Sequence, residues 1–150
     1  TRPFFLEQLN LEVERCKRNN EPLSTFLMDI ELIGVNVKEN VLITENVVKA
    51  LAQVIMEQTR RVDIFARWDD FRFIIALPRT SSELAFSITE RMTMAVEKAQ
   101  FDGIGRVHIN AAVVETHGQY SVEEIITRME NKLEHMKVND HSVNVTLADV

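Results

Sequence analysis

The hydrophobic positions of the chain follow two different periods, and this alternation predicts both helices and strands. Four segments repeat apolar residues at intervals of three and four, which is the spacing of amphipathic helices. The last of them opens with Ser121 and Glu124 at the spacing of a capping box. The predicted helices cover residues 3–19, the segment after an expected N-cap at Thr44, the segment from Ser81 to about Gln100, and the segment after Ser121.

Short β-prone runs lie between these helices. The predicted strands cover residues 24–30, 63–67, 71–77, 107–115 and 142–147. The residues between the second and third runs, Trp68-Asp69-Asp70, have hairpin chemistry. A hairpin pairs its strands antiparallel, whereas helical crossovers supply the other neighbours of a sheet. The pattern therefore predicts an α/β (α+β) fold, in which helices flank a mixed five-stranded sheet.

Length and charge limit what this fold can do. The 150 residues suit a single domain, which we expect to span residues 1–150. The formal net charge of −6 disfavours binding to polymeric nucleic acid, which needs a broad basic surface. Cys16 is the lone cysteine, which excludes a disulfide framework and fits a cytoplasmic location. No apolar run is long enough to predict a membrane contact by this domain. Because the sequence begins at Thr1 without a methionine, we expect a piece of a longer protein.

Two segments carry candidate chemistry. The first predicted strand ends in Asp29-Ile30-Glu31, and the hairpin reads Ala66-Arg67-Trp68-Asp69-Asp70-Phe71-Arg72-Phe73. A strand that ends in Asp-hydrophobic-Asp and a hairpin of the form Ala-Arg-x-Gly-Gly-Asp/Glu-Glu-Phe mark the GGDEF family of diguanylate cyclases. The chain resembles this family in pattern and register over nearly its whole length. The resemblance implies the nucleotidyl cyclase-like palm fold and a place in bacterial cyclic di-GMP signalling.

Departures from the family signature lead us to predict a degenerate domain. The family joins two GTP molecules with the help of Mg²⁺ ions held by carboxylates. The resemblance places one such carboxylate at Asp29 and the other at Phe71, which has no side-chain oxygen. Asp69 and Asp70 stand where two glycines normally let the backbone approach the phosphates, and we interpret them as a solvated turn. We therefore expect that the chain is not an enzyme and holds no cofactor or metal, with Asp29 either a remnant ligand or a cap of a neighbouring loop.

Three further positions resemble the nucleotide site of the family. Asn36 matches an asparagine that reads the guanine edge, provided that one loop residue is missing, and Glu45 replaces an aspartate that contacts the same base. Lys137 matches a lysine that contacts phosphates, although a surface lysine is the simpler interpretation because the rest of its motif is absent. Together with Asp29, Asp69, Asp70 and Phe71, these residues form a predicted vestigial nucleotide site. GTP binding at this site stays an alternative.

A separate motif precedes the hairpin. Arg60-Arg61-Val62-Asp63 has the spacing and register of the family's inhibitory product site, and Arg91 matches a further arginine of that site. An arginine fork can bond to O6 and N7 of guanine or to phosphate oxygens. A carboxylate can accept from the guanine N1–H and amine groups. The plain alternative is that Arg60 and Arg61 favour the C-terminal end of the second helix, and that Asp63 pairs with either of them on the surface.

The favoured hypothesis is a non-catalytic cyclic di-GMP receptor that uses Arg60, Asp63 and Arg91 and regulates other domains of its parent protein. A GTP-binding regulatory domain is one alternative, with an attached phosphodiesterase as its output. Another is a purely dimerising module that forms a homodimer and binds no ligand. An active cyclase is the last alternative, and we expect no product from it.

Overall fold

The computed structural model describes residues 1–34, 36, 38–99, 106–136 and 143–148. Helices and strands alternate as the hydrophobic pattern predicts, with ends that differ by a few residues. Their bounds are α1 (Arg2–Asn19), β1 (Leu23–Ile33), α2 (Val41–Gln58), β2 (Ile64–Arg67), β3 (Arg72–Pro78), α3 (Ser82–Lys98), β4 (Arg106–Thr116), α4 (Val122–His135) and β5 (Val143–Leu147).

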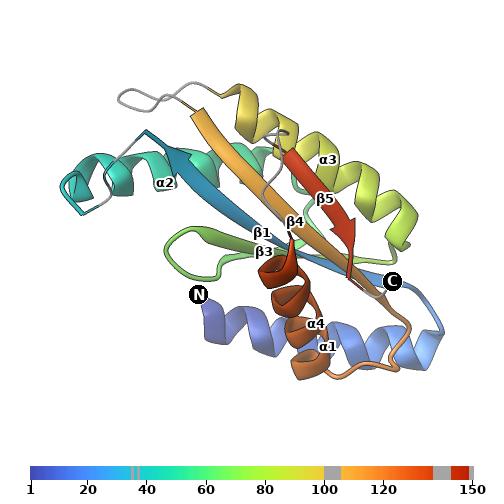
Figure 1. The fold of residues 1–150 in the computed structure, drawn as a ribbon. Coiled ribbons are helices and arrows are strands. Elements are labelled where there is room, and N and C mark those ends of the chain that lie inside the picture. Colours follow the sequence, from blue (N-terminus) through green and yellow to red (C-terminus); the bar gives the residue numbers. More distant parts are fainter. Residues whose placement is uncertain (35, 37, 100–105, 137–142, 149–150) are drawn as a thin grey trace.

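The strands form one mixed sheet in the order β2-β3-β1-β4-β5 (Figure 1). The central strand β1 pairs antiparallel with β3 on one side and with β4 on the other. The hairpin pairs β2 with β3 antiparallel, while β5 lies parallel to β4 after the crossover through α4. The predicted mixed five-stranded sheet is therefore confirmed.

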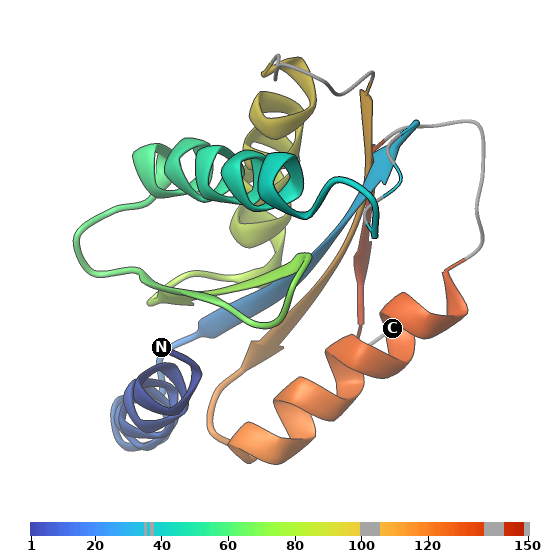
Figure 2. The ribbon, with the colours of Figure 1, turned by 90° about the vertical axis from the view of Figure 1, so that its left-hand side faces the viewer.

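Each face of the sheet carries its own hydrophobic core, because alternate residues of a strand point to opposite sides. Phe26 and Ile30 of β1 belong to the core beneath α2 and α3, whereas Leu27 belongs to the core beneath α1 and α4. Figure 2 shows the two pairs of helices on opposite sides of the sheet. Burying each such side chain contributes about 1.5–3 kcal/mol, so the two cores hold the hairpin and the strand ends in place.

Local capping explains where α3 and α4 begin. The Ser81 hydroxyl accepts from the Leu84 amide, and Ser121 forms the predicted capping box with Glu124. The expected N-cap at Thr44 is wrong, because Thr44 lies buried inside α2 and the helix begins after Asn40. The first turn of α2 is exposed, with Leu42 at 75%, so it lacks the apolar periodicity that marks a helix start in sequence.

Among the residues that the structure describes, no helix combines the length and the apolar composition needed to cross a membrane.

Candidate ligand-binding site

Arg60 and Asp63 form a fixed pair in the turn between α2 and β2. The Asp63 Oδ1 atom accepts from Nε and Nη2 of Arg60 at 3.2 and 2.9 Å, and its Oδ2 accepts from the Arg60 backbone amide at 2.7 Å. The Asp63 side chain is only 3% exposed, whereas the Arg60 side chain is 50% exposed. Both carboxylate oxygens are thus turned onto Arg60, and the arginine presents the accessible surface of the pair.

The Arg60 guanidinium also reaches the turn that follows β3. Its Nη2 donates to the Pro78 carbonyl at 3.4 Å and to the Thr80 hydroxyl at 3.1 Å. Thr80 is buried, and its backbone carbonyl accepts from the Ser24 hydroxyl at 2.7 Å. Arg60 therefore joins two turns that are separated in sequence but meet at one end of the sheet.

The third predicted residue of this site, Arg91, lies on α3, the helix that packs beside α2. Its side chain is exposed. In the portion of the chain that the structure describes, no hydrogen bond or ion pair joins Arg91 to Arg60 or Asp63. The structure therefore brings Arg60 and Asp63 together directly, while Arg91 is an exposed cation on the adjoining helix.

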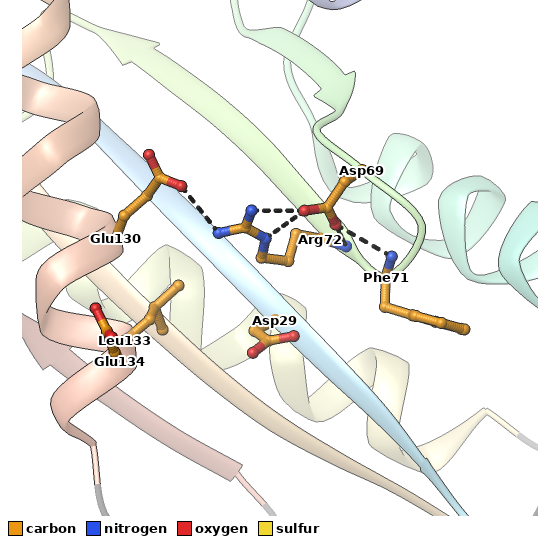
Figure 3. Close-up of a pocket in the computed structure, with 7 residues that line it drawn as sticks. All are labelled: Asp29, Asp69, Phe71, Arg72, Glu130, Leu133 and Glu134. Carbon is orange, nitrogen blue, oxygen red and sulfur yellow. Dashed lines mark hydrogen bonds and ion pairs between the residues drawn. The ribbon is translucent and has the colours of Figure 1, made fainter.

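The hairpin turn is organised by an aspartate and two arginines. Asp69 Oδ1 accepts from the backbone amides of Phe71 and Arg72 at 3.3 and 3.1 Å, and its Oδ2 accepts from Arg72 Nε at 2.6 Å. Arg72 also pairs with Glu130 of α4 at 3.2 Å (Figure 3). Asp70, by contrast, points into solvent with a side chain that is 91% exposed. The solvated-turn interpretation thus fits Asp70, whereas Asp69 holds the turn together.

On the other face of the sheet, Arg67 ties the same turn to α2. Its guanidinium donates to the backbone carbonyls of Asp69 and Asp70 at 3.0 and 2.8 Å and to the Glu45 carboxylate at 3.3 Å. The hydrogen bond from Arg67 lowers the pKa of the Glu45 carboxyl. Glu45, predicted to meet a guanine, is therefore engaged by an arginine of the hairpin.

A cavity of about 410 Å³ opens between the hairpin, the end of β1 and α4 (Figure 3). Its lining is acidic at four positions and includes one arginine. The lining residues are Asp29, Asp69, Phe71, Arg72, Glu130, Leu133 and Glu134.

Asp29 is the carboxylate of this cavity that the sequence singles out. Burial raises the pKa of its carboxyl, the nearby Arg72 opposes that rise in part, and Asp69 adds to it. Phe71, at the expected second metal position, has no side-chain oxygen, and its backbone carbonyl accepts from the Ile30 amide. Within the described part of the chain, no three histidine, cysteine, aspartate or glutamate side chains gather in a way that could hold a metal ion. Of the two positions that the resemblance assigns to metal ligands, Asp29 carries a carboxylate and Phe71 does not.

Replacing Asp29 by asparagine is expected to raise the thermal midpoint at neutral pH. A carboxyl whose folded pKa is raised contributes stability that is full below its unfolded pKa and is lost as the pH rises through the folded pKa. The difference in thermal midpoint between Asp29→Asn and the wild type should therefore shrink as the pH falls toward about 4. Thermal unfolding followed by circular dichroism at several pH values measures it. Asp70→Asn is the matched control, and an equal gain in both variants would contradict the prediction.

Asn36, another predicted site residue, lies apart from these clusters. Asn36 is exposed, and its side-chain oxygen accepts from the backbone amides of Lys38 and Glu39 within its own loop. Lys137 lies outside the described residues. Trp68, next to the turn, is buried against α1, where the Arg2 guanidinium stacks on its ring at 3.6 Å.

Arg72 and Glu130 are site residues that sequence reasoning missed. A register signal existed for Arg72, because it lies directly across from Asp29 in the pairing of β1 with β3. The charge of Arg72 is opposite to that of the family's glutamate at this hairpin position. Glu130 had no local signal, since 58 residues separate it from Arg72.

The model of the protein family described as "Diguanylate cyclase, GGDEF domain" matches residues 1–142 of the chain. This chain belongs to the GGDEF family. The GGDEF domain is 29% identical to the diguanylate cyclase DgcM of Escherichia coli K12 over 93 residues, which are 62% of this chain and 23% of the relative. It is 26% identical to the diguanylate cyclase DgcP of Pseudomonas aeruginosa over 140 residues, which are 91% of this chain and 21% of the relative. The domain thus spans less than a quarter of the length of either relative.

Solved structures confirm the GGDEF fold. The active GGEEF domain of a diguanylate cyclase from Vibrio cholerae matches with a TM-score of 0.80 and 23% identity, over 97% of this chain and 96% of that one. The GGDEF domain of DgcB from Caulobacter crescentus, solved in complex with c-di-GMP, matches with a TM-score of 0.88 and 17% identity, over 99% and 91% of the two chains.

The prediction that the domain is not an enzyme is wrong in the light of these matches. The relatives are named diguanylate cyclases, and one similar structure is an active GGEEF domain. The prediction rests on the missing carboxylate at Phe71 and on the replacement of two glycines by Asp69 and Asp70. In the structure, the Asp69 carboxylate is paired with Arg72, and the exposed Asp70 carboxylate lies 4.0 Å from Arg67, so both replaced glycine positions carry acidic residues with an arginine nearby.

Proposed function

We propose that this GGDEF domain binds cyclic di-GMP at Arg60, Asp63 and Arg91 and thereby regulates other domains of a longer protein. The observation that supports the proposal is the Arg60–Asp63 pair, in which a nearly buried carboxylate aligns a half-exposed guanidinium. Because Asp63 and the turn after β3 fix the arginine in advance, little side-chain entropy is left to lose when a ligand binds. Preorganised arginines of this kind suit anionic ligands with planar hydrogen-bonding edges.

Cyclic di-GMP offers two kinds of acceptor to this surface. Its phosphates carry negative charge, and its guanines present O6 and N7 on the Hoogsteen edge. Arg60 donates to protein acceptors through Nε and Nη2, which leaves the Nη1 side of its fork to the ligand. Arg91, on the adjoining helix, supplies a second cation. In this arrangement Asp63 orients Arg60, and reading of the guanine by Asp63 would require the pair to open.

The expected affinity follows from these contacts. Each hydrogen bond from a charged guanidinium group to the ligand is worth roughly 1.5–3 kcal/mol. Two arginines, together with stacking of a guanidinium on a guanine face, lead to micromolar affinity, or about −8 kcal/mol. The c-di-GMP complex of the Caulobacter crescentus DgcB domain, which has the same fold, supports the choice of ligand.

Replacing Arg60 by alanine is expected to weaken cyclic di-GMP binding by at least about tenfold, because the aligned fork is lost. Arg60→Lys should weaken binding nearly as much, since an ammonium group keeps the charge but not the fork. Isothermal titration calorimetry with purified domain and cyclic di-GMP measures both. Arg61→Ala is the matched control, because Arg61 is an exposed arginine of the same turn.

The proposal fails if wild-type domain releases no heat with cyclic di-GMP, or if Arg60→Ala binds as the wild type does. Because Arg60→Ala leaves a nearly buried carboxylate with fewer partners, its thermal midpoint must be measured as well. Binding should then be compared at a temperature where every variant is folded.

A second candidate function is the synthesis of cyclic di-GMP from GTP. It is supported by the names of the relatives, one of which is 29% identical over 62% of this chain. Incubation of the domain with GTP and Mg²⁺, followed by chromatography of the nucleotides, separates it from a purely regulatory role. Formation of cyclic di-GMP would establish synthesis, whereas unchanged GTP would exclude it.

A further inference from the structure

Arg79 occupies an unusual position beside the Arg60–Asp63 pair. It lies in the turn between β3 and α3 and is exposed to solvent. Its φ angle is +54°, in the left-handed region that glycine and asparagine adopt far more readily than arginine. The chain therefore places a long charged side chain where a smaller residue would fold with less strain.

Contacts on both sides fix the Arg79 backbone next to Arg60. The Arg60 Nη2 donates to the carbonyl of the residue before Arg79, Pro78, and to the hydroxyl of the residue after it, Thr80. The Thr80 hydroxyl also donates to the Pro78 carbonyl at 3.0 Å, and the Thr80 amide donates to the carbonyl of Pro22 at 3.1 Å. The turn is thus rigid, and the Arg79 side chain starts from a point adjoining the Arg60 guanidinium.

The position of Arg79 brings positive charge close to Arg60 in an acidic protein. The sequence has a formal net charge of −6, yet Arg60 and Arg79 lie in two turns that the Arg60 hydrogen bonds join. Within the described residues, Arg60 is held by Asp63, whereas no hydrogen bond or ion pair is found for Arg79. Two cations in adjoining turns favour the binding of an anion.

We propose that Arg79 is a further ligand-binding residue of the cyclic di-GMP site and contacts a phosphate of the dinucleotide. The inference rests on the proposed function, because it places Arg79 in the same site as Arg60. Arg60 would meet one part of the dinucleotide through its free Nη1 side. Arg79, displaced from it along the turn after β3, would neutralise a phosphate through its fork. A phosphate contact of this kind also makes binding more sensitive to salt.

The test uses Arg79→Asn, because asparagine tolerates the left-handed backbone without the positive charge. Isothermal titration with cyclic di-GMP should show about tenfold weaker binding than the wild type, with a smaller loss on raising the salt concentration. The thermal midpoint should be unchanged or slightly raised, which separates lost binding from lost folding. Arg61→Asn is the matched control and should bind as the wild type does.

The outcomes distinguish this inference from the function on which it rests. If the wild type binds and Arg79→Asn binds equally well, the role of Arg79 is refuted while the proposed function stands. If Arg61→Asn loses as much affinity as Arg79→Asn, a general attraction of anions replaces the specific contact and the inference fails. If the wild type does not bind cyclic di-GMP at all, the proposed function itself falls.

Discussion

Replacing Gly118 by alanine is expected to lower the free energy of unfolding by about 3 kcal/mol, through backbone strain and steric overlap together. Gly118 has a φ angle of +102° in the turn between β4 and α4. A Cβ atom added there would lie 2.8 Å from the Lys17 Cα of α1 and still closer to its side chain. Because the backbone of α1 cannot move aside without disturbing the core beneath it, the overlap cannot be relieved locally. Urea denaturation of the purified domain measures the loss.

Gly34 provides the control for this prediction. Its φ angle is +83°, and an added Cβ would meet nothing within 4 Å. Gly34→Ala therefore isolates the cost of a left-handed backbone, which is about 1 kcal/mol. Equal destabilisation in the two variants would show that Gly118 does not serve the close approach of α1.

Replacing Phe73 by alanine is expected to cost about 3–5 kcal/mol, because it empties a fully buried site. Phe73 is the first buried residue of β3 after the hairpin, and its ring stacks on Phe65 at a centroid distance of 5.8 Å. Its loss removes contacts with both α2 and the sheet in the core that fixes the hairpin. The same urea titrations measure the change.

Phe4→Ala is the matched control, since Phe4 is 59% exposed on α1. A surface change of this kind is expected to stay within about 0.5 kcal/mol of the wild type. A loss well below 2 kcal/mol for Phe73→Ala would mean that the surrounding core closes over the cavity.

The sequence predicts the fold well where the signals are local. Ser121 and Glu124 mark the start of α4 because both capping partners lie within one turn. The hairpin is equally clear, since polar turn residues separate two β-prone runs. The start of α2 was missed, because exposed apolar residues in its first turn hide the periodicity and only the backbone shows that Asn40 precedes it.

In the candidate site, too, contacts between residues that are close in sequence could be predicted, whereas contacts between distant residues could not. Local spacing predicts that Asp63 pairs with Arg60 or Arg61, and the structure shows that Arg60 is the partner. The bond from Arg60 to Thr80 could not, because it depends on how two turns meet after the sheet has formed. The ion pair between Asp69 and Arg72 could be predicted from the sequence, because the two residues carry opposite charges and are three positions apart.

The hairpin is anchored from both sides of the sheet, by Arg67 to α2 and by Arg72 to α4. The loop cannot tilt toward one helix without stretching its tie to the other. Its tip is therefore held between two helices on opposite faces of the sheet, and a movement of either helix would shift it. Because both ion pairs are partly exposed, a higher ionic strength would weaken both of them.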